Sequence, residues 1–176
     1  MPPSPACGSS PALTLADFTS PSLIVPTLRN RDLETVIQEL SQMMEREGRV
    51  PDLLSFFRAA LERESVATTD MEAGIAFPHA RLAGLNTVSF ALGRSHEPLN
   101  WGASARAVRL VFLIAVPATD VTQYLPLISG LARLAKDSGL MERLYAAPDA
   151  GAMFEALGQI SLRTNATPEK LKQVPG

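Results

Sequence analysis

The longest apolar run in the chain, VRLVFLIAVP at residues 108–117, is the feature that most restricts the fold. Apart from Arg109 it is apolar and rich in β-branched residues, and it lacks the strict alternation of a strand with one wet face. Such a run predicts a central strand that is covered on both sides. It is too short to span a bilayer. The rest of the chain must therefore supply covering elements for both faces of a sheet.

Amphipathic patterns before and after this run supply those elements. Apolar residues at three-and-four spacing predict a helix from Asn30 to Gly48, and Asp52 is expected to cap a second helix with Leu53 or Leu54, Phe57, Ala60 and Leu61 on its buried face. After Pro117, a long helix capped by Thr122 and two shorter ones (140–145 and 151–162) are predicted. Shorter strands are expected at 23–25, 74–77 and 88–92. Helices, then strands, then helices favour an α+β fold, with three α/β/α layers around a mixed sheet.

Length and composition indicate one domain. The chain has 176 residues, 46% of them hydrophobic, and a net charge of −2, which provides no basic field for nucleic acid. The predicted domain spans residues 13–162 between a disordered tail at 1–12 and a frayed one at 163–176. The only cysteine, Cys7, excludes an internal disulfide and is expected to be an exposed bystander. No signal peptide is recognised, so a cytoplasmic protein is predicted.

One of the two histidines stands in an unusual place, in the segment GIAFPHARL at residues 74–82. Pro78 restricts Phe77 to extended geometry, so His79 should sit on a stiff support at the end of a strand. Two interpretations are open: His79 only finishes the strand and bonds to a backbone carbonyl, or its neutral imidazole is a nucleophile. A phosphoryl group is the natural electrophile for that nucleophile, given an arginine and a few hydrogen-bond donors nearby.

The segment RESVATTDMEAGIAFPHARL, residues 63–82, resembles the active-site region of fructose–mannitol type enzyme IIA domains, which include nitrogen-regulatory relatives. These domains belong to the bacterial phosphoenolpyruvate-dependent sugar phosphotransferase system. The resemblance continues through EPLNW at 97–101, the strand end AVP at 115–117 and the helix that follows, and it covers roughly residues 13–160. The matching motif positions are Arg63, Glu64, Thr69, Gly74, Ala76, Pro78 and His79.

The resemblance implies a phosphotransferase with a phosphohistidine intermediate and no cofactor. His79 would accept a phosphoryl group from the histidine-containing phosphocarrier protein, then pass it to a IIB domain or change the binding of a regulated partner. Arg63 would lie beside the phosphohistidine and bond two of its oxygens, unless it is only the charged end of an exposed helix. Thr69 would add a hydroxyl donor or only cap a turn. Glu64 is expected to be a solvated or salt-bridged neighbour.

The sequence departs from the family pattern at the second active-site histidine, where Tyr124 stands. Tyr124 could donate one hydrogen bond to a phosphoryl oxygen or simply belong to the core. Glu72 replaces a frequent glycine, and His96 is expected on the surface unless its loop folds over His79. These departures leave an alternative function open, a non-catalytic regulatory domain that binds protein partners. A metal site at His79 is not expected, because no other ligand shares a recognisable spacing with it.

Overall fold

The apolar run forms the central strand of a mixed, six-stranded sheet. The structure, a computed structural model, describes residues 12–119 and 121–162, so Cys7 and the predicted tails lie outside the described residues apart from Ala12. Strand β6 (Leu110–Pro117) pairs antiparallel with β5 (Ser89–Arg94) and, along its other side, parallel with β3 (Ile75–Ala76) and β4 (His79–Leu82). The outer strands are β1 (Ile24–Val25) beside β5 and β2 (Asp70–Met71) beside β3.

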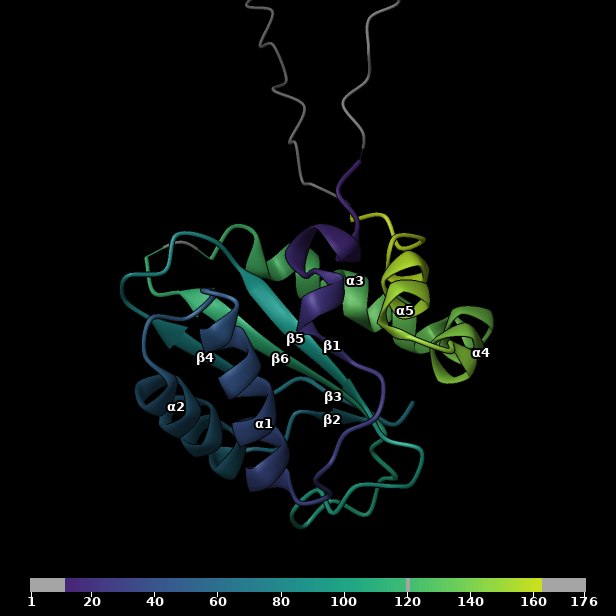
Figure 1. Ribbon diagram of the computed structural model, residues 1–176, viewed down its shortest axis with the longest axis horizontal. Helices are drawn as coiled ribbons and strands as arrows, with labels where there is room; N and C mark the ends of the chain where they lie inside the picture. The colour runs from purple at the N-terminus through teal and green to yellow at the C-terminus, as the bar shows by residue number, and fades with distance from the viewer. Residues whose placement is uncertain (1–11, 120, 163–176) are drawn as a thin grey trace, which may run out of the picture.

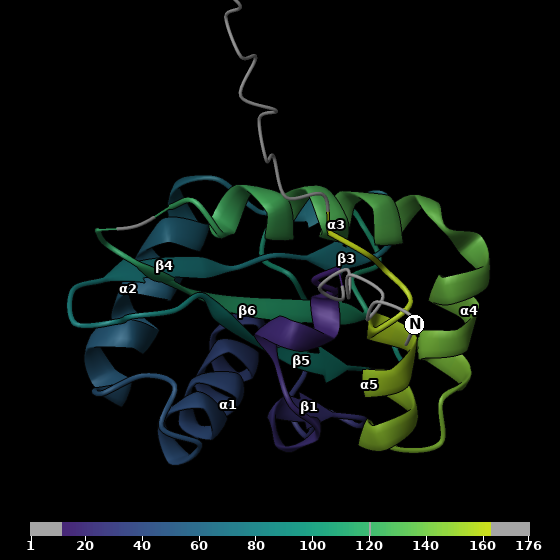
Figure 2. The same ribbon diagram turned by 90° about the horizontal axis from the view of Figure 1, so that it is seen from above.

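Helices cover both faces of this sheet, as the buried central strand requires. On one face lie α1 (Leu33–Arg46) and α2 (Leu53–Val66), and on the other α3 (Tyr124–Lys136), α4 (Ser138–Ala146) and α5 (Ala150–Leu157) (Figures 1 and 2). Two short 3₁₀ helices, η1 (Leu15–Phe18) and η2 (Pro21–Leu23), precede β1. Alternate side chains of β6 enter two separate cores, so that Phe112 packs with α3 and Leu113 with α1. The predicted three-layer α+β arrangement is confirmed.

The helix starts agree with the sequence in part. Asp52 caps α2 as predicted, accepting hydrogen bonds from the backbone N–H groups of Leu54 at 3.2 Å and Ser55 at 3.3 Å. The start predicted for α1 is wrong: Asp32 precedes the helix, while the Asn30 side chain donates to Glu39 of α1 at 3.0 Å. The cap predicted for α3 is likewise displaced, because Gln123 and not Thr122 stands at its start.

The buried stripe of α2 differs from the predicted one. Phe56, Ala60 and Glu64 are the buried residues of this helix, whereas Leu54 is 51% exposed. These three positions lie four residues apart on one face, which packs against both α1 and β4. The helix thus places a carboxylate where the sequence pattern had predicted only apolar side chains.

His79 begins a strand rather than ending one. Pro78 separates β3 from β4 along the same side of β6, because it has no N–H to donate to a neighbouring strand. Its carbonyl accepts a hydrogen bond from the Ile114 N–H at 2.9 Å. After this break, β4 pairs His79 with Ile114 and continues in parallel to Leu82. The strand predicted at 74–77 is β3, shortened to Ile75–Ala76, and β4 is a further strand that was not predicted. In the described ranges, no helix is both long and apolar enough to cross a membrane.

Candidate functional site

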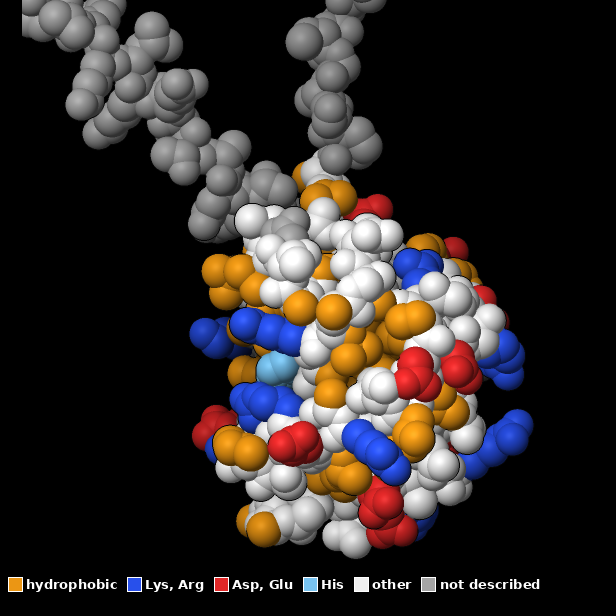
Figure 3. All heavy atoms as spheres, turned by 90° about the vertical axis from the view of Figure 1, so that its left-hand side faces the viewer, with side chains coloured by type: hydrophobic (Ala, Val, Ile, Leu, Met, Phe, Trp, Pro, Cys, Tyr) orange, Lys and Arg blue, Asp and Glu red, His pale blue; other side chains and the backbone are white. Residues whose placement is uncertain are grey.

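A surface hollow of about 590 Å³ lies between the C-terminal half of α2 and strand β4. Its lining brings together two of the predicted site residues, Arg63 and His79, although 16 positions separate them in the sequence. Arg81, from the same strand as His79, lines it as well. The space-filling view of this face shows a histidine flanked by basic side chains, with hydrophobic side chains close by (Figure 3).

The imidazole of His79 is half-buried and held in one orientation. Its Nδ1 lies 3.0 Å from the carbonyl oxygen of Phe77. A carbonyl oxygen can only accept a hydrogen bond, so this contact requires the proton on Nδ1. The lone pair of a neutral ring is then on Nε2. The expected bond to a backbone carbonyl is therefore present and uses Nδ1, and Nε2 is the nitrogen left for a nucleophilic role.

The surroundings of His79 favour its neutral form. Burial lowers the pKa of His79, and the positive charges of Arg63 and Arg81 act in the same direction. The hydrogen bond to Phe77 and the negative charge of Glu64 oppose this shift without cancelling it. Because the net pKa lies below the ordinary value, Nε2 keeps its lone pair at neutral pH and somewhat below it.

Arg63 is exposed and near the end of α2, where its Nη1 donates to the carbonyl oxygen of Ala67 at 3.1 Å. That carbonyl follows the last helical residue, so the guanidinium covers the negative end of its own helix. The positive charge of Arg63 lowers the pKa of His79 more than the charge of Arg81 does. The remaining N–H groups of its planar fork can reach toward a tetrahedral anion in the hollow.

Tyr124 stands beside His79, where the family pattern has a second histidine. The two rings lie 5.6 Å apart between centroids and are tilted by 44°. Burial raises the pKa of Tyr124, while the charges of Arg63 and Arg81 act against this rise. The phenol therefore keeps its proton and can donate a hydrogen bond near the His79 ring. Tyr124 also packs against the core, so the two expectations for this residue are compatible.

Thr69 and Glu64 lie behind the hollow in a shared hydrogen-bond network. Glu64 is only 1% exposed and accepts from the Thr69 N–H at 2.8 Å, the Thr69 hydroxyl at 2.8 Å and the Trp101 Nε1–H at 2.9 Å. The expectation of a solvated or salt-bridged Glu64 is wrong, because the helix turns this side chain inward. The Thr69 hydroxyl gives its proton to Glu64 and accepts from the Phe77 N–H at 3.0 Å. Its proton is thus committed within the protein.

The contact between Glu64 and Trp101 in this network was not predicted from the sequence. Two signals were available in the sequence: an acidic residue on an otherwise apolar helix face, and the only tryptophan of the chain. A buried carboxylate requires hydrogen-bond donors, and an indole N–H is a donor that tolerates burial. Nothing in the spacing indicated that the two residues meet, because 37 positions separate them.

Gly74 lies behind the site, in the turn that joins β2 to β3. Its φ is +77°, and a Cβ placed on it would lie 2.8 Å from the carbonyl oxygen of Ala107 and 3.4 Å from the Tyr145 hydroxyl oxygen. Its own carbonyl accepts hydrogen bonds from the N–H groups of Arg109 at 2.8 Å and Leu110 at 3.1 Å. The missing side chain of Gly74 thus allows a close backbone approach at the start of β6, and Gly74 does not line the hollow.

We expect Gly74→Ala to destabilise the protein more than Gly48→Ala does. Both glycines have a positive φ, which costs an alanine about 1–2 kcal/mol, but a Cβ at Gly48 meets nothing within 4 Å. At Gly74 the clash with the backbone should add about 1–3 kcal/mol. Urea denaturation of the two variants measures the difference, and equal losses of unfolding free energy would show that the Ala107 segment moves aside freely.

Two residues that could have altered the site lie elsewhere. His96 follows β5 and its Nε2 lies 3.3 Å from the Thr27 hydroxyl oxygen. In the sheet register, the end of β5 pairs with Leu110, whereas His79 pairs with Ile114, so the loop of His96 does not fold over His79. Glu72 is exposed and does not line the hollow.

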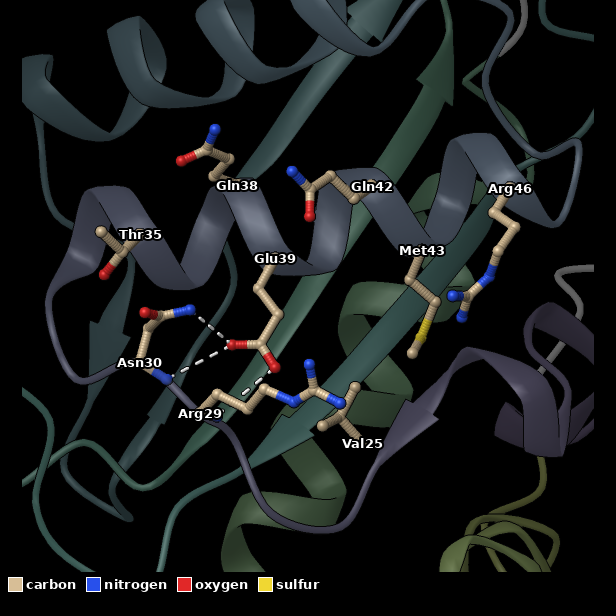
Figure 4. A pocket seen from close by; sticks show the side chains of 9 residues that line it. All are labelled: Val25, Arg29, Asn30, Thr35, Gln38, Glu39, Gln42, Met43 and Arg46. Atoms are coloured by element: carbon tan, nitrogen blue, oxygen red, sulfur yellow. Dashed lines mark hydrogen bonds between the residues drawn. The ribbon is translucent and has the colours of Figure 1, made fainter.

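A second cavity, of about 370 Å³, lies against α1 (Figure 4). The carboxylate of Glu39 points into it and accepts from the Asn30 side chain at 3.0 Å and from the backbone N–H groups of Arg29 and Asn30, both at 3.4 Å. Glu39 therefore occupies these three donors, and its negative charge disfavours a phosphoryl group beside it, although the side chains of Arg29 and Arg46 also line this cavity.

A three-layer α/β/α domain with a histidine and two arginines in one surface hollow has the makeup of a phosphoryl-carrier domain. The comparisons agree: the model of the family described as "Phosphoenolpyruvate-dependent sugar phosphotransferase system, EIIA 2" matches residues 17–160. This chain belongs to that family. The match lies inside the predicted domain at 13–162.

Similar proteins are described as nitrogen regulatory proteins and as an enzyme IIA component. A nitrogen regulatory protein of Bradyrhizobium diazoefficiens is 28% identical over 147 residues, which cover 82% of this chain and 95% of that protein. The crystal structure of nitrogen regulatory protein IIA-Ntr from Neisseria meningitidis has a TM-score of 0.70 at 24% identity and covers 81% of this chain and 98% of that one. The complex of enzyme IIAMTL with phosphorylated enzyme IIBMTL from Escherichia coli contains a chain with a TM-score of 0.66 at 20% identity, covering 78% of this chain and 95% of that chain.

Proposed function

We propose that this EIIA domain accepts a phosphoryl group on Nε2 of His79 from the histidine-containing phosphocarrier protein, in the cytoplasm, and acts as a relay or a regulator. The observation that carries the proposal is the bond from His79 Nδ1–H to the Phe77 carbonyl, which leaves Nε2 as the nucleophilic atom. Arg63, Arg81 and Tyr124 surround this ring with donors suited to phosphoryl oxygens.

The transfer is a balanced exchange between two imidazoles. The Nε2 lone pair forms a bond to phosphorus as the N–P bond of the carrier's phosphohistidine breaks, and that electron pair returns to the carrier's ring. The proton on the other nitrogen of each ring stays in place. The chain's contribution is alignment and positive charge, which a loose phosphoryl transition state needs more than it needs a general base.

A protein donor suits the rim of the hollow. Val66, which lines it, is 79% exposed, and Leu125, next to Tyr124, is 65% exposed. Exposed apolar side chains around a basic centre are typical of the anchors of a protein interface. A IIB domain is one candidate for the next partner, since the similar enzyme IIAMTL is described in complex with phosphorylated enzyme IIBMTL. A regulated target protein is the other candidate.

Phosphorylation can be tested with phosphoenolpyruvate, enzyme I and a cognate phosphocarrier. We expect an acid-labile, base-stable phosphate on the wild-type protein, located by mass spectrometry on the peptide that contains His79. Omission of the phosphocarrier is the control. Wild-type protein that stays unmodified with a carrier that phosphorylates another EIIA domain would refute the proposal.

Arg63→Ala should slow phosphoryl acceptance about tenfold or more. The variant loses a charge-assisted hydrogen bond to the phosphoryl oxygens, which contributes about 1.5–3 kcal/mol. Arg63→Lys should recover only part of the rate, because an ammonium keeps the charge but not the planar fork. Arg58→Ala, on an exposed position of α2 outside the hollow, is the matched control. Equal single-turnover rates for the Arg63 and Arg58 variants would remove Arg63 from the site.

The second candidate function is a regulatory domain that binds partners without efficient phosphoryl transfer. Tyr124 favours it, since a phenol does not become a cation near neutral pH, as the family's second histidine can. A pulldown separates the two functions. A partner that binds wild type and His79→Ala equally, together with no phosphorylation, would support the regulatory domain alone.

A further inference from the structure

A continuous chain of hydrogen bonds connects a buried carboxylate to the imidazole of His79. It starts at Trp101, whose Nε1–H donates to Glu64 at 2.9 Å, and continues with the Thr69 hydroxyl, which donates to Glu64 at 2.8 Å. The Phe77 N–H then donates to Thr69 Oγ1 at 3.0 Å, and the Phe77 carbonyl accepts from His79 Nδ1 at 3.0 Å.

The direction of every bond in this chain is determined by its chemistry. An indole N–H and a backbone N–H can only donate, so both Trp101 and Phe77 are donors. Because Thr69 Oγ1 accepts from Phe77, the hydroxyl proton is free to go to Glu64 Oε2. Glu64 therefore acts as an acceptor at both oxygens, and a neutral amide at this position could not do so. Reversal of any one bond would leave a buried polar group unpaired.

Glu64 has no cationic partner among the described residues. The ion pairs within the described ranges are Arg46 with Glu47 and Arg106 with Asp70. Burying a carboxylate is costly, and here three hydrogen bonds offset that cost without an ion pair. Its negative charge is also felt at His79, where it opposes the effects of burial and of the arginines.

We infer that Glu64 is a positioning residue for phosphoryl transfer, which acts on His79 through Thr69 and the Phe77 backbone. This inference rests on the proposed function. By accepting the Thr69 proton, Glu64 leaves a lone pair of Oγ1 to hold the Phe77 N–H. Pro78 limits the backbone on the other side of Phe77, so the carbonyl between them is directed at Nδ1. That carbonyl selects the tautomer in which Nε2 is the nucleophile. Trp101 holds Glu64 in place from the opposite side.

Two variants break the chain at different bonds. Glu64→Gln keeps the shape of the side chain but replaces an acceptor with an NH₂ group. Thr69→Val removes the hydroxyl acceptor of the Phe77 N–H, which then keeps only its longer contact of 3.4 Å with the Thr69 carbonyl oxygen. Thr69→Ser keeps the hydroxyl and should behave as wild type. Ser104→Ala is the matched control, because it removes a hydrogen bond of 2.6 Å to Asp70, the other buried carboxylate. Among the described residues, the Asp70 side chain is not bonded to Trp101, Glu64, Thr69, Phe77 or His79.

The decisive readout is the ¹⁵N spectrum of the His79 ring in the unphosphorylated protein. We expect wild type and the Thr69→Ser and Ser104→Ala variants to show the Nδ1–H tautomer, and the Glu64→Gln and Thr69→Val variants to show a mixture. The pKa of His79 should also fall in Glu64→Gln, because the opposing negative charge is gone. Single-turnover phosphorylation of Glu64→Gln and of Thr69→Val should be about tenfold slower than that of the wild type.

The outcomes separate this inference from the proposed function. Folded Glu64→Gln and Thr69→Val proteins with the wild-type tautomer and pKa would show that Glu64 only supports α2, and would overturn the inference. A wild-type ring with its proton on Nε2 would overturn it as well, even if the variants fail to fold. Tautomer shifts in the two variants, together with a wild-type protein that no carrier phosphorylates, would support the positioning of the His79 ring by Glu64 and reject the proposed function.

Discussion

We expect His79→Gln to abolish the proposed acid-labile phosphorylation of this chain, with a rate below about one-thousandth of the wild-type rate. Glutamine is close to histidine in length and polarity but has no ring nitrogen with a lone pair. His79 is half-buried at the start of a short strand, so the substitution should cost only about 1 kcal/mol of unfolding free energy. The rate is measured with a phosphorylated carrier in a single turnover, followed by treatment at low pH to release the phosphate.

His96→Gln is the matched control for this experiment, since it changes the other histidine of the chain. His96 is exposed and lies near Thr27, at the opposite end of β5 from the hollow. Its variant should be phosphorylated at the wild-type rate. If His79→Gln kept acid-labile phosphate and lost it only when His96 was also replaced, the phosphoryl acceptor would be His96 and our proposal would be wrong.

Arg94→Leu should lower the free energy of unfolding by about 3–5 kcal/mol, because up to four buried carbonyls would each lose a charged donor at about 1–3 kcal/mol, with partial relaxation. Arg94 ends β5 and is only 3% exposed. Its Nε donates to the Pro26 carbonyl at 2.8 Å, and its Nη1 donates to the carbonyls of Leu144 at 2.7 Å, Tyr145 at 3.2 Å and Ala147 at 2.8 Å.

The physical reason for this large effect is the place of these carbonyls. Three of them are at the C-terminal end of α4, where the last carbonyls of a helix have no partner within the helix and carry partial negative charge. A buried guanidinium satisfies them and connects α4 to the segment after β1. Burial also lowers the pKa of Arg94, an effect that the charge of Arg109 reinforces, although not enough to remove its proton near neutral pH.

Arg143→Leu, at an exposed position of the same helix, is the control and should change stability by less than about 0.5 kcal/mol. Urea denaturation followed by circular dichroism measures both variants. A loss below about 1 kcal/mol for Arg94→Leu would mean that water reaches these carbonyls and replaces the guanidinium. Where the variant stays folded, His79 should still accept phosphate, since Arg94 does not line its hollow.

Periodicity predicted the elements that bury one continuous stripe or run. The strand β6, the helix α1 and the Asp52 cap of α2 could be read from local sequence, because a covered strand must be apolar throughout and a helix cap acts within three residues. The strands β2 and β4 could not, since Asp70–Met71 and His79–Leu82 are short and partly polar. They are strands because β3 and β6 offer them hydrogen bonds, which local sequence does not encode.

The sequence by itself determined that His79 stands on a stiff support, because Pro78 restricts the backbone locally, while Arg63 was assigned to the same site through the resemblance of residues 63–82 to the family. Only the tertiary structure decided which protons and charges meet there. It joined Glu64 to Trp101, directed the Phe77 carbonyl at Nδ1 and buried Arg94 among helix carbonyls. The reason is that hydrogen-bond direction and burial depend on which distant segments pack together, and residue spacing contains no record of that packing.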